Sequence, residues 1–134
     1  MIVQEELPMV VIPSMNDTHL EDMIIINRLD DAAKSENIDA VAQTLQELLD
    51  HTSIHFSDEE KLMKEAKFLD FNSHKSEHDR HLRELKSIIK YFQTHQDSKA
   101  IRAYIEGNLK SWMIHHVETM DASAAKFIQK ELSL

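Results

Sequence analysis

The chain has 134 residues, with 15 Lys plus Arg, 24 Asp plus Glu, 9 His, 1 Gly, 2 Pro and no Cys. Its formal charge of −9 provides no excess of basic groups for phosphates or an anionic bilayer, which argues against nucleic-acid and membrane partners. The missing cysteine excludes disulfides, thiolate nucleophiles and cysteine-ligated iron–sulfur clusters. With scarce glycine and proline and 42% hydrophobic residues, the chain is expected to form long helices in one domain.

We expect no targeting signal at the start of the chain. Residues 1–15 include Glu5 and Glu6 and no basic group, so a signal peptide is not expected. No stretch reaches the roughly 20 apolar residues that a membrane-spanning helix needs. We therefore expect a cytoplasmic protein, a location that the missing cysteine also favours.

The first segment is predicted to be an arm followed by a helix. Pro8 and Pro13 both lie near the start, so residues 1–13 are expected to form an extended arm. A first helix is predicted to open at Ser14, whose hydroxyl can cap the backbone of Asp17, and to fade in the polar run 30–37.

Three further helices are predicted from apolar residues that recur at helical intervals. Their expected ranges are about 39–67, 73–95 and 98–132. Asn72 or Ser73 is the expected N-cap of the third helix. Because short connections force neighbouring helices to run in opposite directions, we predict an all-α fold, an antiparallel up-down-up-down four-helix bundle. The single domain spans 1–134, with the arm at 1–13 and the bundle at 14–134.

Histidine is unusually frequent, and at least one histidine falls in each predicted helix. A single histidine is usually an ordinary half-buried residue. His55 and Glu59 are four residues apart, as are His74 and His78, so each pair shares one helical face. In an antiparallel bundle, these pairs, His19 near the start of the first helix and the late segment 116–121 all reach the same layer. This convergence predicts a site inside the bundle.

His116 and Asp121 do not fit a regular helix. Five residues of an α-helix turn through about 500°, which would leave the two side chains roughly 140° apart. We predict a π-bulge between them, because its wider turn brings residues i and i+5 to one side.

The chemistry of this donor set indicates two metal ions. Five imidazoles and two carboxylates without sulfur suit iron, manganese, copper or zinc, and do not suit calcium or magnesium. Seven ligands are too many for one ion. If both carboxylates bridge two ions that share an oxo or hydroxo group, about eleven of the twelve bonds of two octahedra are filled. The open position would accept a small ligand.

The segments 55–63, 74–78 and 112–121, preceded by His19, resemble the bacterial hemerythrin family. The resemblance extends from about residue 15 to residue 127. It implies two iron ions (Fe²⁺/Fe³⁺) with an oxo or hydroxo bridge. It implies the following ligands: His74, His78 and His116 on one iron, His19 and His55 on the other, and Glu59 and Asp121 as bridges. The two-histidine iron would keep the vacancy.

The resemblance further implies reversible dioxygen binding at the non-haem di-iron centre, for oxygen delivery, storage or sensing, and thus a binding protein rather than an enzyme. The alternative is a di-iron enzyme that reduces peroxide, nitric oxide or dioxygen with an external electron donor. Phe56, Trp112, Met113 and Val117 neighbour the ligands in sequence and are the candidate apolar wall of the ligand pocket. Their packing would also suit an ordinary core.

The remaining alternatives concern other kinds of helical protein. A ferritin-like oxidase needs Glu-x-x-His on two helices, but here no acidic residue precedes a histidine by three positions. A helical interaction module with accidental histidines is the metal-free alternative. For His51, His81 and His115 we expect surface or supporting positions, and for His95 an exposed one near a helix end.

Overall fold

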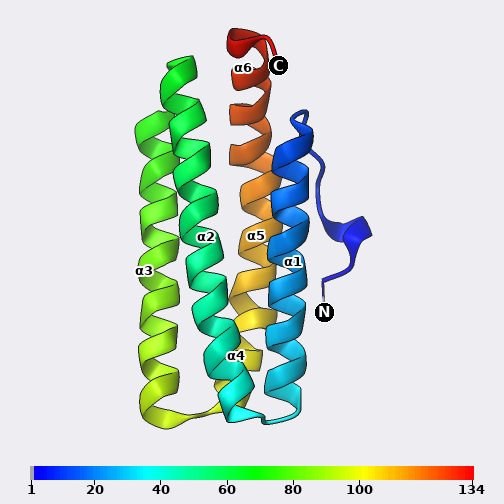
Figure 1. Cartoon of the computed structure of the whole chain (residues 1–134), viewed down its shortest axis with the longest axis vertical. Helices are drawn as coiled ribbons and strands as arrows, with labels where there is room; N and C mark the ends of the chain where they lie inside the picture. Colours follow the sequence, from blue (N-terminus) through cyan, green and yellow to red (C-terminus); the bar gives the residue numbers. More distant parts are fainter. Residues whose placement is uncertain (1) are drawn as a thin grey trace.

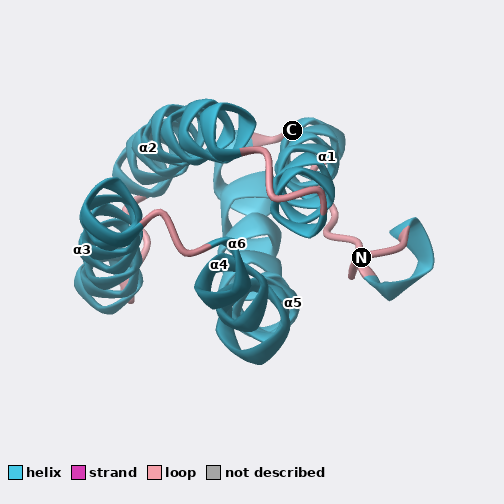
Figure 2. Ribbon diagram, turned by 90° about the horizontal axis from the view of Figure 1, so that it is seen from below, coloured by secondary structure: helices cyan, strands magenta, loops and turns pink. Residues whose placement is uncertain are grey.

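Four antiparallel helical rods make up the protein, as the computed structural model of residues 2–134 shows (Figure 1). Three rods are α1 (Pro13–Lys34), α2 (Ile38–Ala66) and α3 (Phe71–His95). The fourth runs without a break through α4 (Ser98–Tyr104), η2 (Ile105–Leu109), α5 (Lys110–His116), η3 (Val117–Asp121) and α6 (Ala122–Leu132). Viewed along their length, the rods surround a common interior (Figure 2). The predicted all-α four-helix bundle is confirmed.

The first helix begins one residue earlier than predicted, and its predicted cap is wrong. Pro13 occupies the first turn, and the N-cap residue Ile12 makes no side-chain capping bond. Proline suits this position because its fixed φ matches the helix and its missing N–H would have no helical partner there. The helix also continues through the polar run to Lys34, because Leu29 and Ala33 stay buried in the core.

Other helix starts depend on side chains just before them. The Asn37 side chain accepts a hydrogen bond from the Ala40 amide and caps α2. Asp97 accepts hydrogen bonds from two amides at the start of α4. The predicted cap of α3 at Asn72 or Ser73 is wrong: the N-cap position falls at Asp70, without a side-chain bond, because Phe71 already closes a turn onto Phe68.

The arm runs beside α1 and contains one 3₁₀ turn, η1 (Gln4–Glu6), so it is less extended than predicted (Figure 1). Two asparagines of α1 fix it. Asn27 accepts from the Ile2 amide at 2.8 Å and donates to the Ile2 carbonyl at 2.7 Å. Asn16 makes the same paired contact with Val10, at 2.8 Å for each bond. The arm is therefore part of the packed structure.

The interior holds two apolar clusters with a polar layer between them. One cluster includes Leu29, Leu45 and Phe92, and the other includes Met63 and Ile128. Along the four rods, buried histidine and carboxylate side chains gather in the turns where residues of one cluster give way to residues of the other. The bundle therefore positions a polar site in its middle, enclosed by hydrocarbon on both sides.

Within residues 2–134, none of the helices combines the length and the apolar character needed to cross a membrane.

Candidate metal centre

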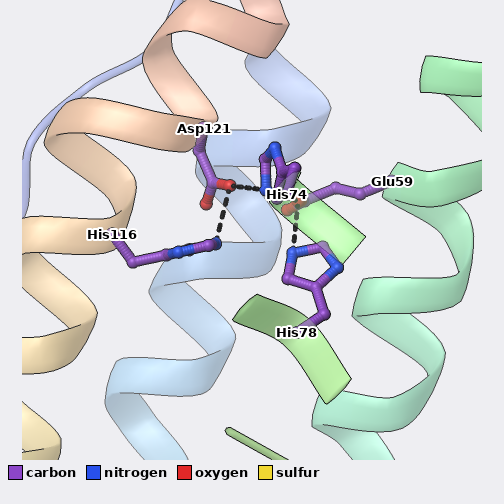
Figure 3. Close-up of side chains that lie close together, drawn as sticks. All are labelled: Glu59, His74, His78, His116 and Asp121. Carbon is purple, nitrogen blue, oxygen red and sulfur yellow. Dashed lines mark ion pairs between the residues drawn. The ribbon is translucent and has the colours of Figure 1, made fainter. Parts of the chain in front are cut away.

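All seven side chains predicted from the sequence as ligands lie in this polar layer. At most 7% of each residue is exposed to solvent. They come from all four rods: His19 from α1, His55 and Glu59 from α2, His74 and His78 from α3, His116 from α5, and Asp121 from η3. Figure 3 shows five of them pointing toward one another. We call these seven residues the candidate metal centre.

The predicted π-bulge is confirmed, and it positions Asp121. The segment η3 (Val117–Asp121) is a π-helical turn that directly follows His116. Its wider winding brings His116 Nε2 within 3.1 Å of Asp121 Oδ1. A second π turn, η2 (Ile105–Leu109), was not predicted from the sequence.

One half of the centre contains three histidines, and we call it the three-histidine half. Asp121 Oδ1 lies 3.0 Å from His74 Nε2, as well as near His116. Glu59 Oε1 lies 3.3 Å from His78 Nε2 and 3.4 Å from His74 Nε2. One donor atom from each of these five residues lies within 4.8 Å of the others.

The other half contains two histidines, and we call it the two-histidine half. Asp121 Oδ2 accepts a hydrogen bond from His19 Nε2 at 2.9 Å. Glu59 Oε2 lies 2.5 Å from His55 Nε2 and 3.8 Å from His19 Nε2. Each carboxylate therefore directs one oxygen toward each half, as bridging ligands of two cations would.

Unpartnered polar atoms show that these residues fit a metal pair. The Nε2 atoms of His74, His78 and His116 are buried without a hydrogen-bond partner, as are Glu59 Oε1 and Asp121 Oδ1. Although these atoms lie close together, the angles between them are not those that a hydrogen bond requires. Leaving buried polar atoms unpartnered costs free energy, which bonds to metal ions would recover.

The charge balance of the centre also favours cations. Burial alone would lower the pKa of His19 and His74, but their contacts with Asp121 and Glu59 raise each pKa to about 9. Burial likewise opposes ionisation of the two carboxyl groups, yet the surrounding imidazoles hold both pKa values below their ordinary range. The carboxylates therefore attract positive charge, and metal ions would displace the imidazole protons.

Two acidic residues that the sequence did not single out orient the histidine rings. Glu60 Oε2 lies 2.8 Å from Nδ1 of His78, and Asp22 Oδ2 lies 2.8 Å from Nδ1 of His55. A carboxylate on the remote nitrogen fixes which ring nitrogen faces a metal. Asp22 follows His19 by three residues, so helical spacing was a usable signal, whereas nothing in the sequence distinguished Glu60 from its neighbours.

A cavity of about 30 Å³ adjoins the centre, enough for a water or a diatomic molecule. All four residues predicted as its apolar wall line it: Phe56, Trp112, Met113 and Val117. Among the candidate ligands, both histidines of the two-histidine half line it, as do His116 and Asp121, whereas His74 and His78 do not. The cavity therefore opens on the two-histidine half.

The remaining histidines occupy different environments. His81 is buried and lines the cavity. His51 is half-buried and lies 2.6 Å from Asp22 through Nδ1. His95 and His115 are exposed.

Residues 11–128 match the family model of the hemerythrin HHE cation binding domain. The chain belongs to the hemerythrin family. Two bacteriohemerythrins are similar to it. That of Aquifex aeolicus (strain VF5) is 26% identical over 84% of this chain and 86% of its own. That of Pseudomonas aeruginosa (strain LESB58) is 28% identical over 89% of this chain and 76% of its own.

The fold of this hemerythrin-family chain also matches solved structures. The crystal structure of wild-type hemerythrin superposes with a TM-score of 0.78 at 21% identity, covering 96% of each chain. The cluster of histidine, glutamate and aspartate side chains thus lies in a bundle of the hemerythrin type, where it is able to hold metal.

Proposed function

We propose that this protein binds dioxygen reversibly at a non-haem di-iron centre, in oxygen delivery, storage or sensing. The observation that carries the proposal is the small apolar cavity on the two-histidine half. This half has two histidines where the other has three, so a coordination position is left there for a small ligand. Family membership and the sulfur-free nitrogen and oxygen donors favour iron.

The seven residues have distinct roles in this proposal. His74, His78 and His116 would hold one iron, His19 and His55 the other, and Glu59 and Asp121 would bridge them. When bound, the iron pair supplies the electrons for reversible binding of dioxygen. Phe56 and Trp112, with Met113 and Val117, keep bulk water and anions away, since solvent entry favours irreversible oxidation.

A di-iron enzyme that reduces peroxide, nitric oxide or dioxygen with an external electron donor is the second candidate. One observation favours it: the buried His81, which is outside the candidate metal centre, places a polar ring in the wall of the cavity. A polar group beside a redox centre is suited to proton transfer.

Visible spectroscopy distinguishes the two functions. The iron-loaded protein is reduced without oxygen, exposed to air, and then returned to vacuum. The proposal predicts a stable absorption band that appears in air and disappears under vacuum over repeated cycles. Steady consumption of an added reductant together with oxidant, and no recoverable band, would instead establish the enzyme.

A further inference from the structure

His81 lines the cavity and carries an unpartnered polar atom. Only 3% of the residue is exposed, and its Nδ1 atom is buried without a hydrogen-bond partner. Two other polar side chains of the wall that lie outside the candidate metal centre are engaged: Asp22 contacts His51 and His55, and the Trp112 indole donates to Glu77. The polar ring of His81 is therefore available to a guest molecule.

The orientation of the His81 ring is fixed by its neighbour in the cavity wall. It stacks on the Trp112 indole with ring centroids 3.7 Å apart and an interplanar angle of 2°. Trp112 Nε1 donates to Glu77 at 2.7 Å, and Arg80 donates to the same carboxylate at 2.7 Å. A ring held in this way loses little freedom when it forms a hydrogen bond.

The ring is also in the right protonation state. Burial, with a smaller contribution from nearby positive charge, lowers the pKa of His81 to about 3, so the imidazole is neutral at pH 7. A neutral imidazole carries one N–H donor and one bare acceptor nitrogen. Neither of the two candidate metal clusters found among residues 2–134 includes His81, so both of its nitrogens remain free of that role.

We propose that His81 is a specificity-determining residue that donates a hydrogen bond to the small molecule held in the cavity and thereby slows its release. This inference rests on the proposed function and extends it. It predicts selection for guests whose outer atom accepts a hydrogen bond, such as dioxygen and azide, over apolar guests of equal size.

Four variants of the iron-loaded protein test this role. His81→Phe keeps the aromatic stack on Trp112 without the polar atoms, and His81→Leu removes them with a smaller side chain that cannot overfill the cavity. His81→Gln retains a donor and an acceptor. His95→Phe, an exposed position on the same helix, is the matched control. Iron per chain is measured first, followed by azide affinity of the oxidised protein and the dioxygen release rate of the reduced protein.

The apolar variants should release dioxygen about tenfold faster and bind azide about tenfold more weakly, with iron content unchanged. The glutamine variant and the His95→Phe control should stay near the wild-type values. Wild-type rates in both apolar variants, or a glutamine variant as fast as the phenylalanine variant, would overturn the role of His81. A wild-type protein that binds azide in a His81-dependent way but no dioxygen would contradict the proposed function instead.

Discussion

Glu59 and Asp121 are the residues on which both halves of the candidate metal centre depend. Each directs one carboxylate oxygen toward the three-histidine half and the other toward the two-histidine half. Removing either carboxylate would therefore weaken both cation positions, whereas removing a histidine would weaken one.

Glu59→Gln should reduce iron from two ions per chain to less than one, because a neutral amide cannot bridge two cations. Iron per chain, measured by atomic absorption after reconstitution, checks this. The control is Glu65→Gln, an exposed glutamate on the same helix, which should retain full loading. Full loading of Glu59→Gln would show that the carboxylate does not bridge.

A titrating residue at the edge of the centre gives a pH prediction. Contact with Asp22 raises the pKa of His51 to about 9, against a smaller opposing effect of burial. The pKa of His51 in the folded state lies above its ordinary value near 6.5. The contact of protonated His51 with Asp22 therefore stabilises the folded protein fully below pH 6.5, and this stabilisation is lost as the pH rises through 9. His51→Gln should therefore lower the free energy of unfolding most at pH 6.

Urea unfolding of both proteins between pH 6 and pH 10 measures this difference. The difference in the free energy of unfolding between the wild type and His51→Gln should become smaller toward pH 10. A difference that is constant or widens with pH would contradict the assigned contact with Asp22.

The sequence identifies the seven candidate ligands through helical spacing, which decides which side chains share a face, together with the antiparallel topology, which brings the four rods to one layer. His55 and Glu59 needed only their four-residue separation, and the same holds for His74 and His78. Glu60 was missed because its role depends on which ring approaches it from a neighbouring rod, which no local pattern encodes. The spacing of Asp22 from His19 indicated a shared face, but its contact with His55 also comes from a neighbouring rod.

At the scale of elements, the π turn η3 is the device that completes the centre. The five-residue spacing of His116 and Asp121 predicted it, because no regular α-helix brings both side chains to one side. The predicted helix caps at Ser14 and at Asn72 or Ser73 were wrong because neither α1 nor α3 begins with a side-chain cap. The start of α1 is determined by the fixed φ of Pro13, and the start of α3 by the turn in which the Phe71 amide donates to the Phe68 carbonyl.

Inserting one alanine after the exposed Thr119 should lengthen the spacing of His116 and Asp121 to six residues and rotate Asp121 out of the centre by about 100°. Iron binding should be lost while helical circular dichroism stays near the wild-type value. Thr119→Ala, which removes the side chain but keeps the residue count, is the control and should load iron fully. Retention of two irons by the insertion variant would mean that the register set by the π turn is not required.

At the scale of the whole molecule, the bundle encloses a charged layer between two apolar clusters. Such a layer is costly to bury unless its groups are paired, and cations would pair them across all four rods. Metal ions that bind only the folded state would therefore stabilise the bundle as a unit.

Removing iron with a chelator under reducing conditions should lower the melting temperature by about 10 °C or more, as expected for a loss of about 4 kcal/mol in a domain of this size. Differential scanning calorimetry before and after chelation checks this, with re-addition of iron as the control. An identical melting temperature for both forms would show that the layer is stable without cations.

The central claim is that side chains from all four rods hold two irons and leave one position for dioxygen. Gas uptake by the fully reduced, iron-loaded protein tests it most directly. The account predicts about two irons per chain and about one dioxygen taken up for every two irons, recovered intact under vacuum. One iron per chain, or uptake that continues beyond this ratio without recovery of the gas, would contradict it.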